Sequence, residues 1–236
     1  MDRRTFLRGA VASTGVASLA GCSEILGEDS AAGAGRQWLP SGQALPYESG
    51  GTGQYNAVLT SPATLSNHRR DIGADTWAQY RSTWVDSEYR FSTPGELDAV
   101  AVAIAPVGVL FSAASGTFRP VRIADRLEND DFSSVSGDSE FRYYQSASGE
   151  QVYAFTSDAF IVVRVPSGLE STDNQETDLV EVADTVIDAE LGAVDRYGDN
   201  MPALGALIDR GLSGESIRYH HHPERWQDRD PEDLDP

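Results

Sequence analysis

One pattern occurs twice along the middle of this chain and limits the folds open to it. Two apolar runs of strand length lead into an amphipathic helix, first within residues 97–127 and again within residues 151–191. A hairpin followed by a helix favours an antiparallel sheet with helices packed against it. We therefore predict an α+β fold with a weak ββα duplication. We expect a two-layer sandwich with a mostly antiparallel sheet and helices on one face, for which a ferredoxin-like arrangement is one form.

The helices of the two copies are predicted from proline placement and apolar spacing. Pro120 opens the first helix, and Val121, Ala124 and Leu127 would share its apolar face. The second helix, over 179–191, follows the i, i+3, i+4, i+7 rule of an amphipathic helix. Its predicted face comprises Leu179, Val182, Ala183, Val186, Ile187 and Leu191.

Further elements are expected on either side of the two copies. A proline after a serine cap predicts the start of one helix. Aromatic residues spaced by three and four predict a second helix. We expect its aromatic stripe to pack in the core, and the alternative is that the stripe faces a planar ligand. These elements are a strand over 55–60, a helix over 62–71, the stripe of Trp77, Tyr80 and Trp84, and a last helix over 201–212.

The first 22 residues predict export and lipid attachment. Arg3 and Arg4 precede Phe6 and Leu7, a run of small apolar residues follows, and Leu-Ala-Gly-Cys ends the stretch at Cys22. The apolar run is shorter than the roughly 20 residues that a transmembrane helix needs. The stretch resembles a twin-arginine export signal ending in a lipobox. This resemblance implies passage through the twin-arginine translocase, cleavage before Cys22, and a lipid on its sulfur that anchors the chain at the extracellular face of the cell membrane.

These features divide the chain into four parts. Residues 1–21 are the signal peptide, 22–54 the lipidated cysteine and a flexible tether, 55–214 the α+β domain, and 215–236 a disordered acidic tail. The tether and the tail are assigned from small, polar and acidic residues without an apolar period.

Composition narrows the chemistry open to this chain. The formal charge is -19, every basic side chain is arginine, and the sequence contains no lysine. Removing residues 1–21 takes away three arginines and one aspartate, which leaves -21. This bias resembles a protein of a halophilic archaeon, and it argues against nucleic acid as a partner because phosphates would be repelled. Without lysine and with Cys22 lipidated, Schiff-base, phosphate-loop, thiolate and disulfide chemistry are excluded.

Two short motifs are candidate sites. An extended backbone would aim His220 and His222 the same way, with Glu224 as a third metal ligand. The alternative for this cluster is a solvated patch. Gly137-Asp138-Ser139 matches the nucleophile motif of one esterase family, but no downstream Asp-x-x-His supplies a base, so we predict a polar turn.

The sequence identifies no assembled catalytic set and no cofactor. We therefore expect a membrane-anchored, non-enzymatic binding or interaction module whose protein or small-molecule ligand is unknown. Two alternatives stay open. One is a metal-dependent surface hydrolase that uses the histidine cluster, and the other is an accessory solute-binding component of a transporter.

Overall fold

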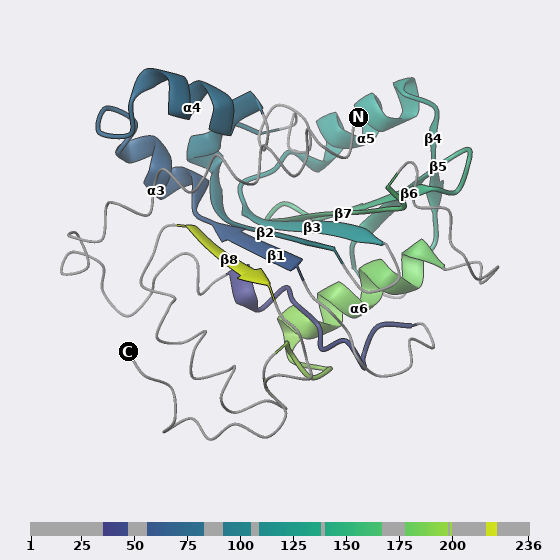
Figure 1. Ribbon diagram of the computed structural model, residues 1–236. Coiled ribbons are helices and arrows are strands. Elements are labelled where there is room, and N and C mark those ends of the chain that lie inside the picture. The colour runs from purple at the N-terminus through teal and green to yellow at the C-terminus, as the bar shows by residue number, and fades with distance from the viewer. Residues whose placement is uncertain are drawn as a thin grey trace.

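The computed structural model describes residues 35–46, 56–82, 92–104, 109–137, 140–166, 178–197, 199 and 216–220, the last range for its backbone only. Within these residues an eight-stranded sheet carries the helices (Figure 1). The strands are β1 (Asn56–Thr60), β2 (Leu97–Ile104), β3 (Leu110–Gly116), β4 (Phe132–Val135), β5 (Arg142–Ser146), β6 (Gln151–Phe155), β7 (Ala159–Arg164) and β8 (Ser216–His220). The helices are α3 (Pro62–Asn67), α4 (Ala74–Tyr80), the 3-10 turn η4 (Pro94–Glu96), α5 (Pro120–Asn129) and α6 (Leu179–Leu191).

Neighbouring strands are antiparallel throughout this sheet, whose order is β4-β5-β6-β7-β3-β2-β1-β8. The two predicted hairpins are β2–β3 and β6–β7, and they meet where β3 pairs with β7, with Phe111 opposite Val163. The α+β prediction with a mostly antiparallel sheet is confirmed, and α5 and α6 follow the two hairpins as expected. A ferredoxin-like arrangement is not found, because each of its split βαβ units places one strand between the two strands that a helix joins, and no pair of strands joined by a helix is arranged in this way in the described sheet.

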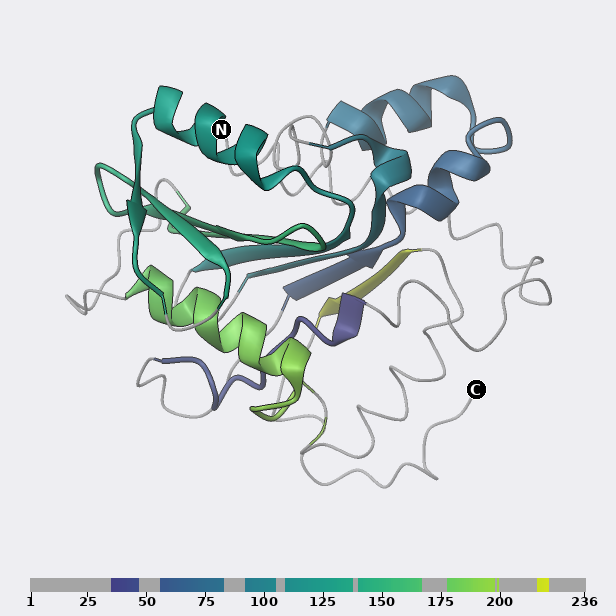
Figure 2. The ribbon, with the colours of Figure 1, turned by 180° about the vertical axis from the view of Figure 1, so that it is seen from behind.

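The two faces of the sheet are covered by different helices. Ile161 and Val163 of β7 lie in one core cluster with α6, whereas Phe160 and Val162 lie in a second cluster with α5. Figure 2 shows α5 and α6 on opposite sides of the sheet. The prediction that the helices share one face is therefore wrong. Successive side chains of a strand point to opposite faces, so a strand that is apolar throughout needs cover on both.

The domain also extends beyond the bounds predicted for it. Trp38, Leu39 and Leu45 are buried in the cluster that contains α6, and the Tyr197 backbone N–H donates to the Leu39 carbonyl at 2.8 Å. The predicted tether over 22–54 is thus wrong for residues 35–46, whose three apolar side chains pack without a regular period. The backbone of β8 pairs with β1, so the predicted disordered tail over 215–236 is wrong for residues 216–220.

Local signals explain where the helices begin and end. Pro62 opens α3 behind Ser61, as predicted. The Asp178 carboxylate accepts from the Val180 N–H at 2.9 Å and caps α6, which ends at Gly192 in the left-handed region with φ of 71°. The predicted apolar face of α6 is buried except for Leu191, which is 69% exposed because it stands at the end of the helix.

The aromatic stripe is only partly described. Trp77 and Tyr80 of α4 stack with their ring centroids 5.5 Å apart, and burial raises the pKa of Tyr80 to about 12. Both rings are half-buried and α4 has no fully buried residue, so these two side chains do not form the core stripe that the spacing predicts. Trp84 and the helix predicted over 201–212 lie outside the described residues. In the part of the chain that is described, no helix has both the length and the apolar character needed to cross a bilayer.

Candidate functional site

One wall of the candidate site is the short turn η4. Its sequence, Thr93-Pro94-Gly95-Glu96, has the capping-box spacing in which a glutamate reaches back to the N-cap residue. The Glu96 Oε2 atom accepts from the Thr93 backbone N–H and from the Thr93 hydroxyl, each at 2.8 Å, and from the Ser92 hydroxyl at 3.5 Å. The bonds from Thr93 are the main reason why the pKa of Glu96 lies below its ordinary value, with a smaller contribution from the charge of Arg119. The carboxylate is therefore fixed in place and ionised at neutral pH.

The opposite wall is the outer face of α5. Ile123, Ala124 and Leu127 are buried against the sheet. This differs from the predicted face in one residue, because Val121 is 64% exposed and Ile123 takes its place. Because Ile123, Ala124 and Leu127 face the sheet, Arg122 and Arg126 of α5 are on the exposed side of the helix.

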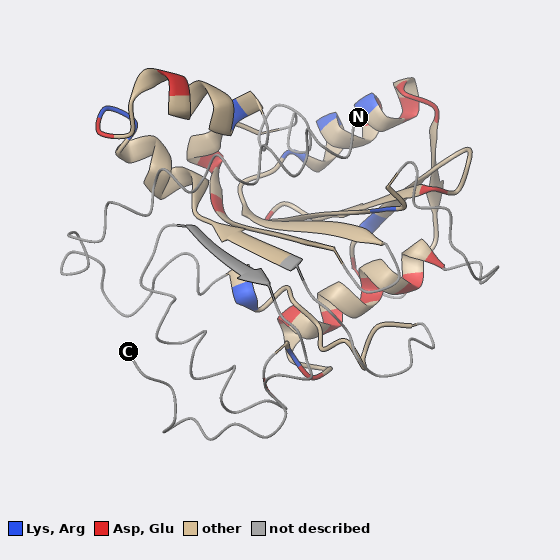
Figure 3. Ribbon diagram, in the orientation of Figure 1, with Lys and Arg blue, Asp and Glu red and all other residues tan. Residues whose placement is uncertain are grey.

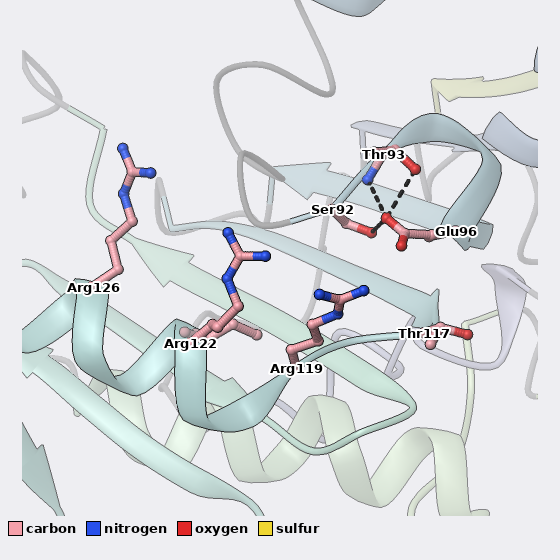
Figure 4. A pocket seen from close by; sticks show the side chains of 8 residues that line it. Ser92, Thr93, Glu96, Thr117, Arg119, Arg122 and Arg126 are labelled. Carbon is pink, nitrogen blue, oxygen red and sulfur yellow. Dashed lines mark hydrogen bonds between the residues drawn. The ribbon is translucent and has the colours of Figure 1, made fainter.

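Three arginines occupy the face that results. Arg119 stands at the N-cap of α5, and Arg122 and Arg126 follow at spacings of three and four residues. Residues at i, i+3 and i+7 lie on one side of a helix. Figure 4 shows the three side chains extending from α5 to the same side, with Ser92, Thr93 and Glu96 across the pocket from them.

The two walls are held together by the end of β3. The Thr117 N–H donates to the Glu96 carbonyl at 2.8 Å, and the Phe118 N–H donates to the Ser157 carbonyl at 2.8 Å. The Phe118 ring is buried and stacks on Phe160 with centroids 5.6 Å apart. Because both bonds fix the backbone just before Pro120, the first turn of α5 is held beside η4.

Between these walls lies a cavity of about 330 Å³. We call it the arginine pocket, and its described lining is Ser92, Thr93, Glu96, Thr117, Arg119, Arg122, Ile123 and Arg126. Three guanidinium groups and one carboxylate give this lining a formal charge of +2. Figure 3 shows the contrast with α6, which carries acidic side chains.

The three arginine side chains of the pocket are exposed to solvent. Across the described residues, no hydrogen bond or ion pair is formed by the guanidinium groups of Arg119, Arg122 and Arg126. The arrangement also opposes the preferences of the helix. Arg119 and Arg122 are cations at a positively charged N-terminus, and Arg122 and Arg126 are like charges at i, i+4. Such placements cost about 0.2–1 kcal/mol each, so a bound anion would relieve them.

The pocket can thus bind an anion with directional bonds. Guanidinium groups bind carboxylate and phosphate through two parallel N–H···O bonds, which adds specificity as well as energy. The hydroxyl of Thr117 adds a group that can donate or accept.

The predicted site residues lie elsewhere. His220 is the last residue of β8, opposite Asn56 of β1, and its side chain is not described. The remaining predicted residues fall outside the described part of the chain, and these are His222, Glu224, Cys22, Arg3, Arg4, Phe6 and Leu7. Among the described residues no three His, Cys, Asp or Glu side chains gather as a metal site would require.

The esterase-like motif is described only at its first residue. Gly137 follows β4 and lies against the Tyr143 ring, where an added Cβ would come within 2.3 Å of Cε2. This close approach to a buried ring gives Gly137 a packing role, while Asp138 and Ser139 are not described.

The sequence reasoning missed the arginine pocket, although a signal for it was present. Arginines at 119, 122 and 126 share a helix face in a chain of net charge -19. A run of cations at helical spacing is unexpected in so acidic a sequence, and it could have been singled out before the structure was known.

Comparisons with known proteins identify no family. No protein-family model matches this chain, and no curated protein is significantly similar to it. Among solved structures it is similar to crystal form I of TP0453, with 13% identity, a TM-score of 0.41 and coverage of 79% of this chain and 62% of that one. For crystal form IV the identity is 13%, the TM-score 0.37 and the coverage 67% and 54%. These matches cover 54% to 62% of TP0453, which is less than two thirds of its length.

Proposed function

We propose that this chain is a lipid-anchored, extracytoplasmic binding module, and that it holds an anionic ligand in the arginine pocket. The observation that carries the binding role is the set of three guanidinium groups around a cavity of about 330 Å³, none of which pairs with a carboxylate in the described part of the chain. The anchoring rests on the resemblance of residues 1–22 to a twin-arginine signal with a lipobox. An accessory solute-binding component of a transporter would use the same pocket and differ in its partner.

The acidity of the chain sets how the ligand must be held. A net charge of -19 repels anions at long range, but the Debye length falls from about 10 Å at 0.1 M salt to 3 Å at 1 M. Salt therefore removes the long-range repulsion and leaves the direct contacts in the pocket. Paired N–H···O bonds from arginine are suited to this regime, because their strength depends on contact geometry as well as on charge.

Replacing Arg122 tests the binding role. Arg122→Ala removes the middle guanidinium and keeps a good helix former in α5. We expect it to weaken binding of inorganic phosphate about tenfold, since a hydrogen bond to a charged group is worth about 1.5–3 kcal/mol and 1.4 kcal/mol is a factor of ten. Isothermal titration calorimetry on the full chain carrying Cys22→Ser, at constant salt, measures the change.

A second arginine provides the matched control. Arg70 is exposed after α3, outside the pocket lining, and its replacement by alanine changes the net charge equally. Arg70→Ala should leave phosphate binding within about twofold. Equal weakening by both substitutions would show a general charge effect and would contradict a specific pocket.

Replacing Cys22 tests the anchoring. Cys22→Ser removes the sulfur that would carry the lipid, so we expect the protein to move from the membrane fraction to the medium. Immunoblots of both fractions, with wild type in parallel, measure this. Retention of the variant on membranes would mean that another part of the chain anchors it.

A further inference from the structure

The arginine pocket contains a carboxylate that a site for a simple anion would not need. Glu96 lines the same cavity as the three arginines, across from α5 (Figure 4). The hydrogen bonds that Thr93 and Ser92 donate to Glu96 all go to Oε2. Within the described residues the other oxygen, Oε1, accepts no hydrogen bond, so it can take a donor from a ligand.

We infer that the ligand is a hydroxylated anion, such as a phosphate monoester of a polyol, whose hydroxyl donates to Glu96 while its anionic group binds the arginines. This inference rests on the proposed function. A bare anion would be repelled by Glu96 and would gain nothing from it. A ligand that joins an anionic end to a hydroxyl end uses both walls of the pocket.

The arrangement of the charges orients such a ligand. The charge of Arg119 contributes to lowering the pKa of Glu96, so Arg119 is the arginine of the pocket that acts on this carboxylate. From Pro120, next to Arg119, to Arg126 the helix rises about 9 Å, at 1.5 Å per residue. The anionic group is thus expected near Arg122 and Arg126, and the hydroxyl end near Glu96 and Thr117.

Local charge favours a dianion over a zwitterion. The lining carries three positive charges and one negative charge. A phosphate monoester brings about -1.5 to -2 at neutral pH and compensates most of the excess. An ammonium group in place of the hydroxyl would leave more of that excess uncompensated.

The substitution Glu96→Gln separates this inference from general anion binding. Glutamine is also a capping-box residue, so η4 can keep its N-terminal bond to the Thr93 N–H. Loss of the negative charge should tighten binding of inorganic phosphate severalfold. It should also remove the preference for the hydroxylated ligand, since the amide oxygen stays engaged with Thr93 and the amide nitrogen only donates.

Calorimetric titrations of inorganic phosphate, glycerol 3-phosphate and phosphoethanolamine provide the test, on the full chain carrying Cys22→Ser. The unsubstituted pocket should bind glycerol 3-phosphate about tenfold more tightly than phosphate, and Glu96→Gln should bind the two within about twofold. Glu150→Gln, which removes an exposed charge outside the pocket, should keep the tenfold preference.

The possible outcomes distinguish the two proposals. If phosphate binds and glycerol 3-phosphate is not preferred, the inference about Glu96 fails and the anion pocket stands. If phosphoethanolamine binds most tightly, the donor is an ammonium group and the hydroxyl assignment is overturned. If none of the three ligands binds to the Cys22→Ser protein, and this protein has the same unfolding midpoint as the unsubstituted chain, the proposed function fails as well.

Discussion

Replacing Gly116 by alanine tests how the sheet holds the two walls of the arginine pocket together. Gly116 ends β3 and lies opposite Leu97, where the register of β2 and β3 shifts. An added Cβ would lie 2.2 Å from the Glu96 carbonyl oxygen and 3.0 Å from the Leu97 Cα. Both are backbone atoms, so no side-chain rotation can relieve the contact.

The size of the effect follows from these distances. Nonbonded heavy atoms are most stable about 3.5–4.0 Å apart, so the two backbone segments must separate by about 1 Å. Overpacking of this kind costs about 1–3 kcal/mol. The movement also stretches the adjacent bond from the Thr117 N–H to the Glu96 carbonyl, at 2.8 Å, which contributes about 0.5–1.5 kcal/mol. Loss of glycine flexibility in the unfolded chain returns about 0.4–1 kcal/mol, so we expect a net loss of about 2–3 kcal/mol.

Urea unfolding followed by tryptophan fluorescence at constant salt measures this loss, and Gly95→Ala is the control. Gly95 lies in η4 beside the same pocket, and no atom stands within 4 Å of its added Cβ. We expect Gly95→Ala to change the free energy of unfolding by less than about 1 kcal/mol. If Gly116→Ala costs no more than Gly95→Ala, the close approach of β3 to Glu96 does not hold the walls as we argue.

Two further predictions concern pH and salt. The folded-state pKa of Glu96 is lowered mainly by Thr93, so the stabilisation from its carboxylate is present above the unfolded pKa of about 4.3 and is lost as pH falls through the lower folded value. Thr93→Ala removes the hydrogen bond from the Thr93 hydroxyl to Glu96 and keeps the bond from the backbone N–H. Its loss of unfolding free energy relative to wild type should therefore become smaller below about pH 4. A loss that stays constant from about pH 7 to 3 in urea titrations would contradict this role of Glu96. With a net charge of -19, the thermal midpoint should rise between about 0.1 M and several molar potassium chloride as repulsion is screened. A midpoint independent of salt would oppose the halophilic interpretation.

The elements that could be predicted are those whose apolar residues repeat at a regular spacing. Strands β2, β6 and β7 are long apolar runs, and helix α6 has a clear helical period of apolar residues. By contrast, β4 and β5 were missed because β4 contains exposed serines and β5 exposes Arg142. Tyr143 and Tyr144 of β5 pack in the two core clusters on opposite faces of the sheet. Only the structure shows this packing, which identifies β5 as a strand.

The arginine pocket shows a second reason why part of this structure could not be predicted from the sequence. The spacing of Arg119, Arg122 and Arg126 can be recognised in the sequence, but the sequence does not indicate that Glu96 faces them. Glu96 precedes Arg119 by a whole hairpin, and it reaches the arginines only because Gly116 pairs with Leu97 and Thr117 bonds to the Glu96 carbonyl. Strand register across the hairpin, which no local pattern specifies, decides which residues meet in the pocket.

The lengths of two connections explain why the two ββα units place their helices differently. Only residues 117–119 separate β3 from α5, and their backbone bonds to Glu96 and Ser157 leave little freedom for the start of the helix. Between β7 and α6 the chain runs through residues 165–178, a length sufficient to carry a helix to the other face of the sheet. The short connection thus keeps the first turn of α5 across the arginine pocket from η4. It places arginines of one element opposite a carboxylate of another.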